Sequence, residues 1–556
     1  MFRKNSSTYQ SNLFSFASHL GKKITSDLYK TPEYYFFQLI FLNIDETIFA
    51  PIYSTNSASR PNAPINSMIS ALILKEKKDW TYEELFNCIK FDLRVRLAIG
   101  LNSLDEQPFC RSSLFNFQNK LASHFKRTSE NLLEQVFNSL SQEQLKKLRI
   151  KTNIQRSDSF LVNSNIRHYS RLQLLVECII RLHRILSEDD KAIFKNEFTE
   201  YIRANSVHFI YKLKSSEITH KMSEIGTFYH LLYETFRSNY KDKKVFQLFE
   251  RVYKEHFKIV ENKIEIIPST DMNSNILQSP DDVDATYRKK RQQKSQGYSI
   301  NIVETASLEA PLHIITDVSV ASNNVDDSKI LNNRLDKIKE QMPELSELHT
   351  DGGYGSKEND QKMKELKITH IQTAVKGRKA KVDMRIEPIN DTSYSVICPH
   401  QEVVSTLTKR GYKACFDLSI CNKCSLLEDC QSRKQKHCRV FYFDKSIVLS
   451  KHRHKNINQI PVERRSIRSN VEATVQEFKH RLNNGKLKVR ELFRVILFAL
   501  NKAISINFGR IYRLIEKNLK KYRLIYIYLS NLMKIYIKIY INFKIQGKIK
   551  YYSFLT

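Results

Sequence analysis

The sequence predicts an α/β protein whose central sheet is preceded and interrupted by helical segments. Strand-like runs occupy 148–160, 298–303 and 313–320, and another short run precedes Asp351. A helix-like stretch starting near Asp326 separates the last two runs. Strands alternating with helices, each with an aspartate at or near its end, are typical of an α/β core whose site lies at a sheet edge.

The charge of the chain favours a polyanionic partner. Its 556 residues include 90 Lys and Arg against 59 Asp and Glu, for a formal net charge of +31. Such an excess favours nucleic acid, because each neutralised phosphate releases counterions. A merely basic soluble protein from an AT-rich genome would also use Lys, Ile and Asn heavily. The length allows roughly two to four domains with real cores.

No targeting or spanning segment is predicted. The start, Met1-Phe2-Arg3-Lys4-Asn5, lacks the apolar stretch of a signal peptide. No uninterrupted apolar run has the length that crosses a bilayer. We therefore expect a soluble, intracellular protein.

The N-terminal segment of the chain is predicted to be helical. An apolar-rich helix is expected at 65–74, a capping box at Thr81 and Glu84, and a further helix from Ser112 or Ser113. Basic residues lie between and along these helices: Arg94, Arg96, Arg111, Lys120, Lys126 and Arg127. This pattern fits a helix-turn-helix-like DNA-binding module, and it equally fits a helical bundle with a solvated basic face.

A second helical stretch interrupts the strands. Apolar residues at helical spacing within 168–265 predict helices that serve packing or form an insertion. We assign no chemistry to this stretch.

Three short motifs carry the candidate chemistry. Asp158 and Asp351 each follow a strand-like run, and Gly352-Gly353 allows a tight turn beside a ligand. Arg468, Glu472 and Lys479 stand at i, i+4 and i+11, so on one helix they lie within roughly 40° of each other. A carboxylate between two cations is suited to holding a metal beside phosphates. Three carboxylates could then converge on a pair of divalent ions.

These motifs, in this order, resemble the DDE transposases of bacterial insertion sequences. Arg468, Glu472 and Lys479 match the last three letters of the Tyr-Arg-Glu-Lys signature of one large branch, whereas the Tyr position falls on Arg465. Further sequence segments are also similar to this family. They surround Ser157-Asp158-Ser159, Thr350-Asp351-Gly352, Asp284-Ala285-Thr286-Tyr287-Arg288 and Arg60-Pro61. The likeness covers roughly residues 15 to 510 and implies an RNase H-like catalytic core.

The resemblance implies the roles of the site residues. Asp158, Asp351 and Glu472 would be catalytic ligands of two Mg²⁺ ions, for which Mn²⁺ can substitute, in phosphodiester cleavage and strand transfer. Arg468 and Lys479 would hold the DNA backbone near the scissile bond, with Arg465 adding to them. Backbone contacts from the basic run that includes Arg288, Lys289 and Lys290 are a further interpretation, with a solvated charge run as the alternative.

The implied partners are double-stranded DNA and further copies of the chain. The DNA would be the terminal inverted repeats of the transposon and the target. Pairing of two ends predicts a homo-oligomer on DNA, without a membrane partner. The implied location is the bacterial cytoplasm, in association with the nucleoid.

Plainer roles compete for each carboxylate. An aspartate at a strand end is commonly a turn former or helix cap, and Glu472 could be only an i,i+4 partner of Arg468. The competing acidic residues are Asp284, Asp317, Asp326 and Asp327.

The cysteines predict a second, structural metal. Six of the nine lie between Cys398 and Cys438. Cys398, Cys421, Cys424 and Cys430 are the expected ligands of tetrahedral Zn²⁺, with Cys415, Cys438, His400 and His437 as other candidates. Four thiolates leave no open position, which favours a zinc ribbon that stiffens an insertion. The resembling branch carries a Cys-rich insertion at this place.

The predicted domain division follows these patterns. Residues 1–145 form a helical DNA-binding domain, and residues 146–375 and 456–515 form the two segments of the catalytic core. The zinc-ribbon-like insertion occupies 376–455, and a tail occupies 516–556. The tail is rich in Ile, Tyr and Lys, and we interpret it as read-through of AT-rich sequence. A membrane-surface or DNA-binding tail is the alternative.

Two other functions fit some of the sequence features. An RNase H-like nuclease would cut DNA without joining it. A zinc-containing DNA-binding regulator explains the charge and the cysteines but leaves Arg468, Glu472 and Lys479 unused.

Overall fold

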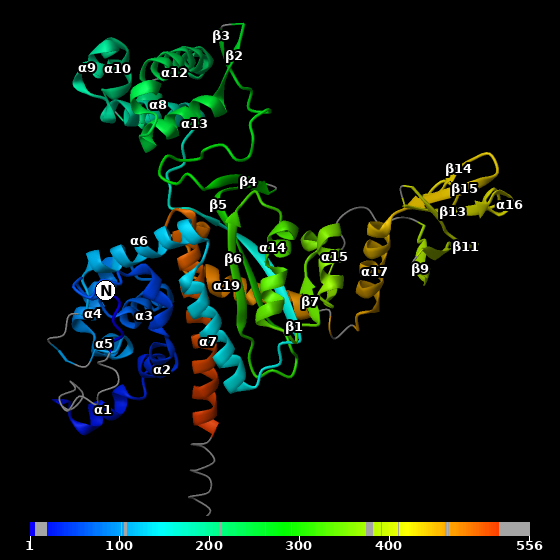
Figure 1. Ribbon diagram of the computed structural model, residues 1–556, viewed down its shortest axis with the longest axis horizontal. Coiled ribbons are helices and arrows are strands. Elements are labelled where there is room, and N and C mark those ends of the chain that lie inside the picture. Colours follow the sequence, from blue (N-terminus) through cyan, green and yellow to red (C-terminus); the bar gives the residue numbers. More distant parts are fainter. Residues whose placement is uncertain are drawn as a thin grey trace, which may run out of the picture.

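Figure 1 shows the computed structural model of the protein. The structure describes residues 1–5, 19–101, 103–104, 108–203, 205–211, 213–261, 263–290, 292–373, 382–390, 392–409, 411–461, 464 and 466–521. Helices at the N-terminal end lie on one side of a central sheet. A second helical group lies beyond one end of the sheet, and a small strand-rich unit lies beyond α17 (Lys445–Gln459).

The N-terminal region is helical, as expected. Its elements are α1 (Lys22–Leu28), α2 (Pro32–Leu39), η3 (Phe41–Asn43), η4 (Glu46–Ile52), α3 (Ile65–Lys78), α4 (Tyr82–Phe91), α5 (Leu93–Ala98), α6 (Arg111–Thr128) and α7 (Leu132–Leu148). The predicted capping box is present at the start of α4, where Thr81 and Glu84 satisfy each other's backbone N–H groups. Local chemistry therefore determines where this helix begins.

The central sheet is mixed and has six strands. They are β1 (Ile154–Asn163), β4 (Thr286–Lys290), β5 (Gln293–Thr305), β6 (Ile315–Ser322), β7 (Glu347–Thr350) and β8 (Thr369–Gln372). β5 is antiparallel to β1, β4 and β6, whereas β7 is parallel to both β1 and β8. The prediction of an α/β protein is confirmed at this level.

Both faces of the sheet are covered. Along β5 the buried Ile302 and Val303 belong to different hydrophobic clusters, as neighbouring residues on a strand must. Val303 packs with Leu331 and Leu335 of α14 (Asp327–Gln341). The other face packs against α19 (Val471–Lys479) and the Leu492–Lys521 helix.

Shorter helices complete the central region. They are η6 (Gly352–Tyr354), α15 (Lys357–Glu365), α18 (Ser466–Ser469) and η8 (Asn483–Gly485).

The predicted second helical stretch is a group of helices between β1 and β4. It contains α8 (Arg171–Ile185), α9 (Glu188–Ile193), α10 (Lys195–Ile202), α11 (Ser206–Tyr211), η5 (Ser215–Glu217), α12 (Ile218–Tyr240), α13 (Lys244–His256) and the hairpin β2 (Phe257–Val260) and β3 (Lys263–Ile266). Its buried apolar residues form a hydrophobic cluster of their own. This group is separate from the sheet in Figure 1.

A buried histidine makes the stability of this helical group sensitive to acid. His256 is 1 % exposed, and the Arg171 Nε–H donates to its Nδ1 over 3.0 Å. Burial, with a further contribution from the charge of Arg171, lowers the pKa of His256 to about 3. The unfolded chain takes up this proton near pH 6.5. Stability is therefore fully present above that pH and is lost as the pH falls towards 3, by about 5 kcal/mol at most.

We expect His256→Gln to reduce this acid sensitivity. Thermal unfolding measured at pH 7.5 and pH 4.5 should show a smaller difference for the variant than for the wild-type protein. Equal differences in the two proteins would contradict the role of His256.

The strand-rich unit lies between β8 and α17. Its elements are β9 (Arg385–Asn390), β10 (Ser393–Ile397), β11 (Glu402–Val404), β12 (Thr406–Thr408), β13 (Gly411–Asp417), α16 (Leu418–Cys421), β14 (Arg433–Lys434) and β15 (Cys438–Phe443). Among its described residues, eight buried side chains form its hydrophobic cluster. α17 joins the unit to the central region, where Arg453 donates to both carboxylate oxygens of Asp360 over 2.8 Å.

One described helix, Leu492–Lys521, is long and apolar enough to cross a membrane by length and composition. Of its most apolar window, 72 % is buried inside the protein. Buried core helices meet the same criterion, so the helix is weak evidence for a membrane. The predicted tail lies, from residue 522 onward, outside the described residues.

Candidate active site

Asp158 lies within β1 rather than at its end, which corrects the sequence-based expectation. The strand continues because residues 159 to 163 pair with 297 to 301 of β5. One Asp158 carboxylate oxygen, Oδ1, accepts the Ser159 N–H over 2.9 Å. Its Oδ2 accepts from Arg468 Nη2 over 2.8 Å. These two hydrogen bonds fix the orientation of the Asp158 carboxylate on the sheet.

Asp351 follows β7 directly, as predicted, and lies beside Asp158. The parallel register pairs Arg156 with His349, so extending it by two residues brings Asp351 opposite Asp158. Burial raises the pKa of Asp158, and the negative charge of Asp351 raises it further, whereas Arg468 opposes both effects. The two aspartates are therefore electrostatically coupled.

Gly353 permits a close approach to the Asp351 carboxylate. Its N–H donates to Asp351 Oδ1 over 2.8 Å. A Cβ atom at Gly353 would lie 3.0 Å from Asp351 Oδ1 and 3.5 Å from Asp327 Oδ2. Both carboxylates thus border the same glycine, and a side chain there would crowd them.

Glu472 joins this group through Arg468. The guanidinium of Arg468 donates from Nη1 to Glu472 Oε1 over 3.0 Å and from Nη2 to Asp158 Oδ2 over 2.8 Å. The side chain of Glu472 is 64 % exposed, whereas that of Asp158 is 11 % exposed. One cation therefore bridges two carboxylates that are far apart in the sequence.

The predicted single helix for Arg468, Glu472 and Lys479 is divided in the structure. Arg468 belongs to α18, and the other two residues belong to α19. The backbone at Asn470, between them, is nearly helical, so the i,i+4 contact of Arg468 and Glu472 survives. Lys479 lies at the far end of α19, with its Nζ 5.4 Å from the centre of the Phe160 ring.

Asp327 is a further carboxylate of the site that sequence analysis treated only as a competitor. It is the first residue of α14, and its Oδ1 accepts from Ser159 Oγ over 2.6 Å. Burial raises the pKa of Tyr354 well above its ordinary value, and the charges of Asp327 and Asp158 add to this effect. The signal available in the sequence was an Asp-Asp pair at a helix start, which is also the pattern of an ordinary cap.

The oxygen donors suit Mg²⁺ in chemical type, since hard cations prefer carboxylates. Yet among the residues that the structure describes, no group of three or more His, Cys, Asp or Glu side chains is placed so that it could hold a metal ion. The charge of Asp351 acts on Asp158, and Arg468 links Glu472 to Asp158.

The other candidate DNA contacts have different surroundings. Arg288 on β4 donates to the backbone oxygens of Asn323 and Val325, over 3.0 and 3.5 Å. Lys289 and Lys290, at the end of the same strand, are exposed. Arg465 lies outside the described residues. Of this basic run, the two lysines are the side chains that solvent reaches most freely.

The four expected zinc ligands line one small cavity. Cys398, Cys421, Cys424 and Cys430 border it, together with His400, and its volume is ≈ 20 Å³. Gln401 donates from its backbone N to Cys398 Sγ over 3.2 Å and from Nε2 to Cys421 Sγ over 3.3 Å. The four thiols border one cavity, but among the described side chains they form no group that could hold a metal ion.

The remaining cysteines of this unit lie elsewhere. Cys415 on β13 is exposed, and its side chain raises the pKa of Cys438 on the neighbouring β15. Neither borders the cavity. The four expected ligands therefore border the cavity, whereas Cys415 and Cys438 do not.

Comparisons with known proteins assign no role to these residues. No family model, curated protein or solved structure matches the chain.

Proposed function

We propose that the protein is a DDE-type transposase with an RNase H-like core, which cleaves transposon ends and joins them to target DNA. The observation that carries the proposal is the Arg468 guanidinium, which joins Asp158 of β1 to Glu472 of α19 beside Asp351. This bridge links two carboxylates that are far apart in the sequence, next to a third that acts on the charge of Asp158. The sheet order, with antiparallel strands on one side of β1 and parallel strands on the other, supports this proposal.

In the proposed mechanism Asp158, Asp351 and Glu472 would hold two divalent ions. When bound, Mg²⁺ would activate the attacking hydroxyl and stabilise the leaving 3′-oxygen. Arg468 would bind a non-bridging phosphate oxygen near the scissile bond, which its planar fork suits. Its hydrogen bonds to Asp158 and Glu472 support this role. In the first step water would attack the phosphodiester at the transposon end and release its 3′-oxygen as a 3′-hydroxyl. In the second step this 3′-hydroxyl would attack a phosphodiester of the target and displace a target 3′-oxygen.

The N-terminal helices offer a surface for the DNA backbone. A cavity of ≈ 560 Å³ lies between η4 and α6 and is bordered by Tyr53, Asn119, Lys120, His124 and Arg127. Cations beside amide and imidazole groups suit phosphate contacts. Together with the net charge of +31, this supports a role of the N-terminal region in holding double-stranded DNA.

The test is an assay of cleavage and strand transfer with DNA duplexes that carry the sequences flanking the coding region. We expect Mg²⁺-dependent nicking at the ends, followed by joining to a second duplex, and some activity with Mn²⁺. Nicking without joining would indicate a nuclease. Binding without either reaction would indicate a DNA-binding regulator.

A further inference from the structure

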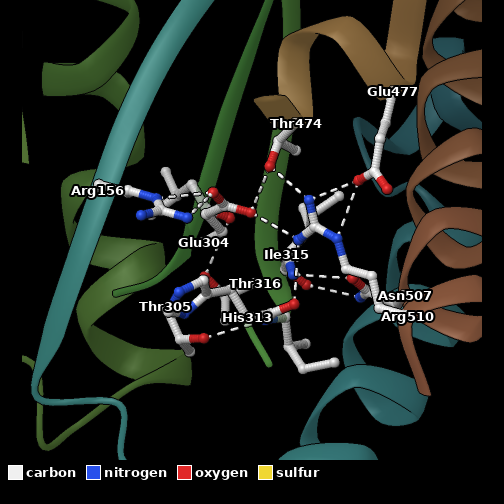
Figure 2. A network of polar contacts seen from close by, with 12 residues as sticks. Arg156, Glu304, Thr305, His313, Ile315, Thr316, Thr474, Glu477, Asn507 and Arg510 are labelled. Atoms are coloured by element: carbon white, nitrogen blue, oxygen red, sulfur yellow. Dashed lines mark hydrogen bonds and ion pairs between the residues drawn. The ribbon is translucent and has the colours of Figure 1, made fainter. Parts of the chain in front are cut away.

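A buried network of charged groups lies next to the candidate site. It joins β1, β5, α19 and the Leu492–Lys521 helix. Figure 2 shows its centre, Glu304, between two arginines from different elements. The side chain of Glu304 is 0 % exposed. Arg156 donates to its Oε1 over 2.7 Å, and Arg510 and Thr474 donate to its Oε2 over 2.7 and 2.8 Å. Every carboxylate oxygen of this buried glutamate is therefore satisfied.

Each partner of Glu304 belongs to an element that carries or adjoins the site. Arg156 precedes Asp158 by two residues on β1, so both side chains lie on the same face of the strand. Thr474 follows Glu472 by two residues on α19. Arg156 also donates from Nη1 to the backbone oxygen of Ile467, the neighbour of Arg468, over 3.0 Å.

The network extends to the Leu492–Lys521 helix. Arg510 of that helix donates to Glu477 Oε2 over 2.6 Å and to the backbone oxygen of His313 over 3.0 Å. It thereby ties the far side of α19 to the segment that precedes β6. Burial by itself would raise the pKa of Glu304, but Arg510 and Arg156 outweigh it, and the pKa lies below its ordinary value.

We propose that Glu304 is a positioning residue that fixes α18 and α19, and with them Arg468 and Glu472, against Asp158 on β1. Glu304 touches none of the reacting groups itself. Apolar packing would hold two elements together at lower desolvation cost than buried ions, whereas directional bonds define their relative placement. The link to catalysis rests on the proposed function, whereas the link to helix placement does not.

The first test is amide hydrogen exchange of Glu304→Gln. The amide keeps the size of the side chain but removes the charge that balances Arg156 and Arg510. We expect exchange in residues 466–479 to accelerate by at least about 10-fold, with β6 and α14 unchanged. Unchanged exchange in 466–479, or uniform acceleration over the whole chain, would overturn the proposal.

The matched control is Asp317→Asn. Asp317 is 1 % exposed, lies on the adjacent strand β6 and pairs with Arg334 of α14, which also binds Glu134. It forms a second buried ion pair, between the same sheet and α14. Its loss should accelerate exchange in α14 and β6 and leave 466–479 protected. Loosening of 466–479 by this control as well would refute a specific role of Glu304.

The second test is the rate of DNA cleavage in a single turnover. At saturating DNA, Glu304→Gln should lower the rate at least about 10-fold and raise the Mg²⁺ concentration needed for half the maximal rate. The Kd for DNA should remain unchanged. If Glu304→Gln accelerates exchange in residues 466–479 but cleaves DNA at the wild-type rate, the proposed link from Glu304 to catalysis is refuted. If the wild-type protein does not cleave DNA, the proposed function is refuted. Hydrogen exchange would still test whether Glu304 fixes α18 and α19 against β1.

Thr474→Val serves if Glu304→Gln does not fold. It removes the hydrogen bond that Thr474 donates to Glu304 and the one that Thr474 accepts from Arg510 Nη2, without changing any charge. We expect faster exchange confined to 471–479. Protection equal to that of the wild-type protein would contradict the proposal.

Discussion

Asp351→Asn is expected to abolish DNA cleavage while leaving DNA binding intact. The asparagine keeps an oxygen that can accept the Gly353 N–H, so the turn after β7 should keep its shape. It loses the negative charge that a divalent ion requires. Loss of a supporting partner of a metal ligand already costs about 10- to 100-fold. Loss of the ligand itself should therefore lower the cleavage rate by more than about 100-fold.

Cleavage rate and DNA affinity are measured on the same preparation. The Kd for DNA should change less than about twofold, because the basic surface is untouched. Asp336→Asn is the matched control, since Asp336 lies on α14 with its side chain 70 % exposed and pairs with Lys362. It removes one negative charge from the same region of the protein and should cleave at the wild-type rate. A wild-type rate for Asp351→Asn would remove Asp351 from the site.

Features determined by neighbouring residues could be predicted from the sequence. The capping box of Thr81 and Glu84 needs only a four-residue pattern, and the structure contains it. The contact of Arg468 with Glu472 follows from their i,i+4 spacing. In each case the physical cause lies within a few residues.

Features determined by partners far along the chain could not be predicted. Asp158 lies within its strand because β5, more than a hundred residues later, continues the pairing. Asp327 reaches the site because α14 packs on the sheet so that Ser159 contacts its first turn. Arg156, Glu304 and Arg510 carry no motif, and only the fold brings them together. Sequence patterns identified the elements, whereas tertiary packing determined which acidic side chains meet.

We predict that Cys398, Cys421, Cys424 and Cys430 bind one Zn²⁺ ion, and that removing it by chelation or by Cys424→Ser unfolds the strand-rich unit. In the part of the unit that the structure describes, eight buried residues form the hydrophobic cluster, and such small cores usually need a metal or disulfides. Binding of structural zinc to small domains contributes about 10–16 kcal/mol, which exceeds what this cluster can replace. We expect bound zinc to fall from about one ion per chain to nearly none. Proteolytic cleavage within residues 385–443 should then become fast.

Cys415→Ser distinguishes this site from the other cysteines of the unit. Cys415 is exposed on β13, contacts Cys438 and does not border the cavity of the four expected ligands. Cys415→Ser and Cys424→Ser each replace one thiol by a hydroxyl. The two variants therefore differ only in the position of the lost thiol. We expect Cys415→Ser to retain zinc and protease resistance. Zinc loss in both variants would place the ion elsewhere in the unit, and zinc retention in Cys424→Ser would exclude the proposed ligand set.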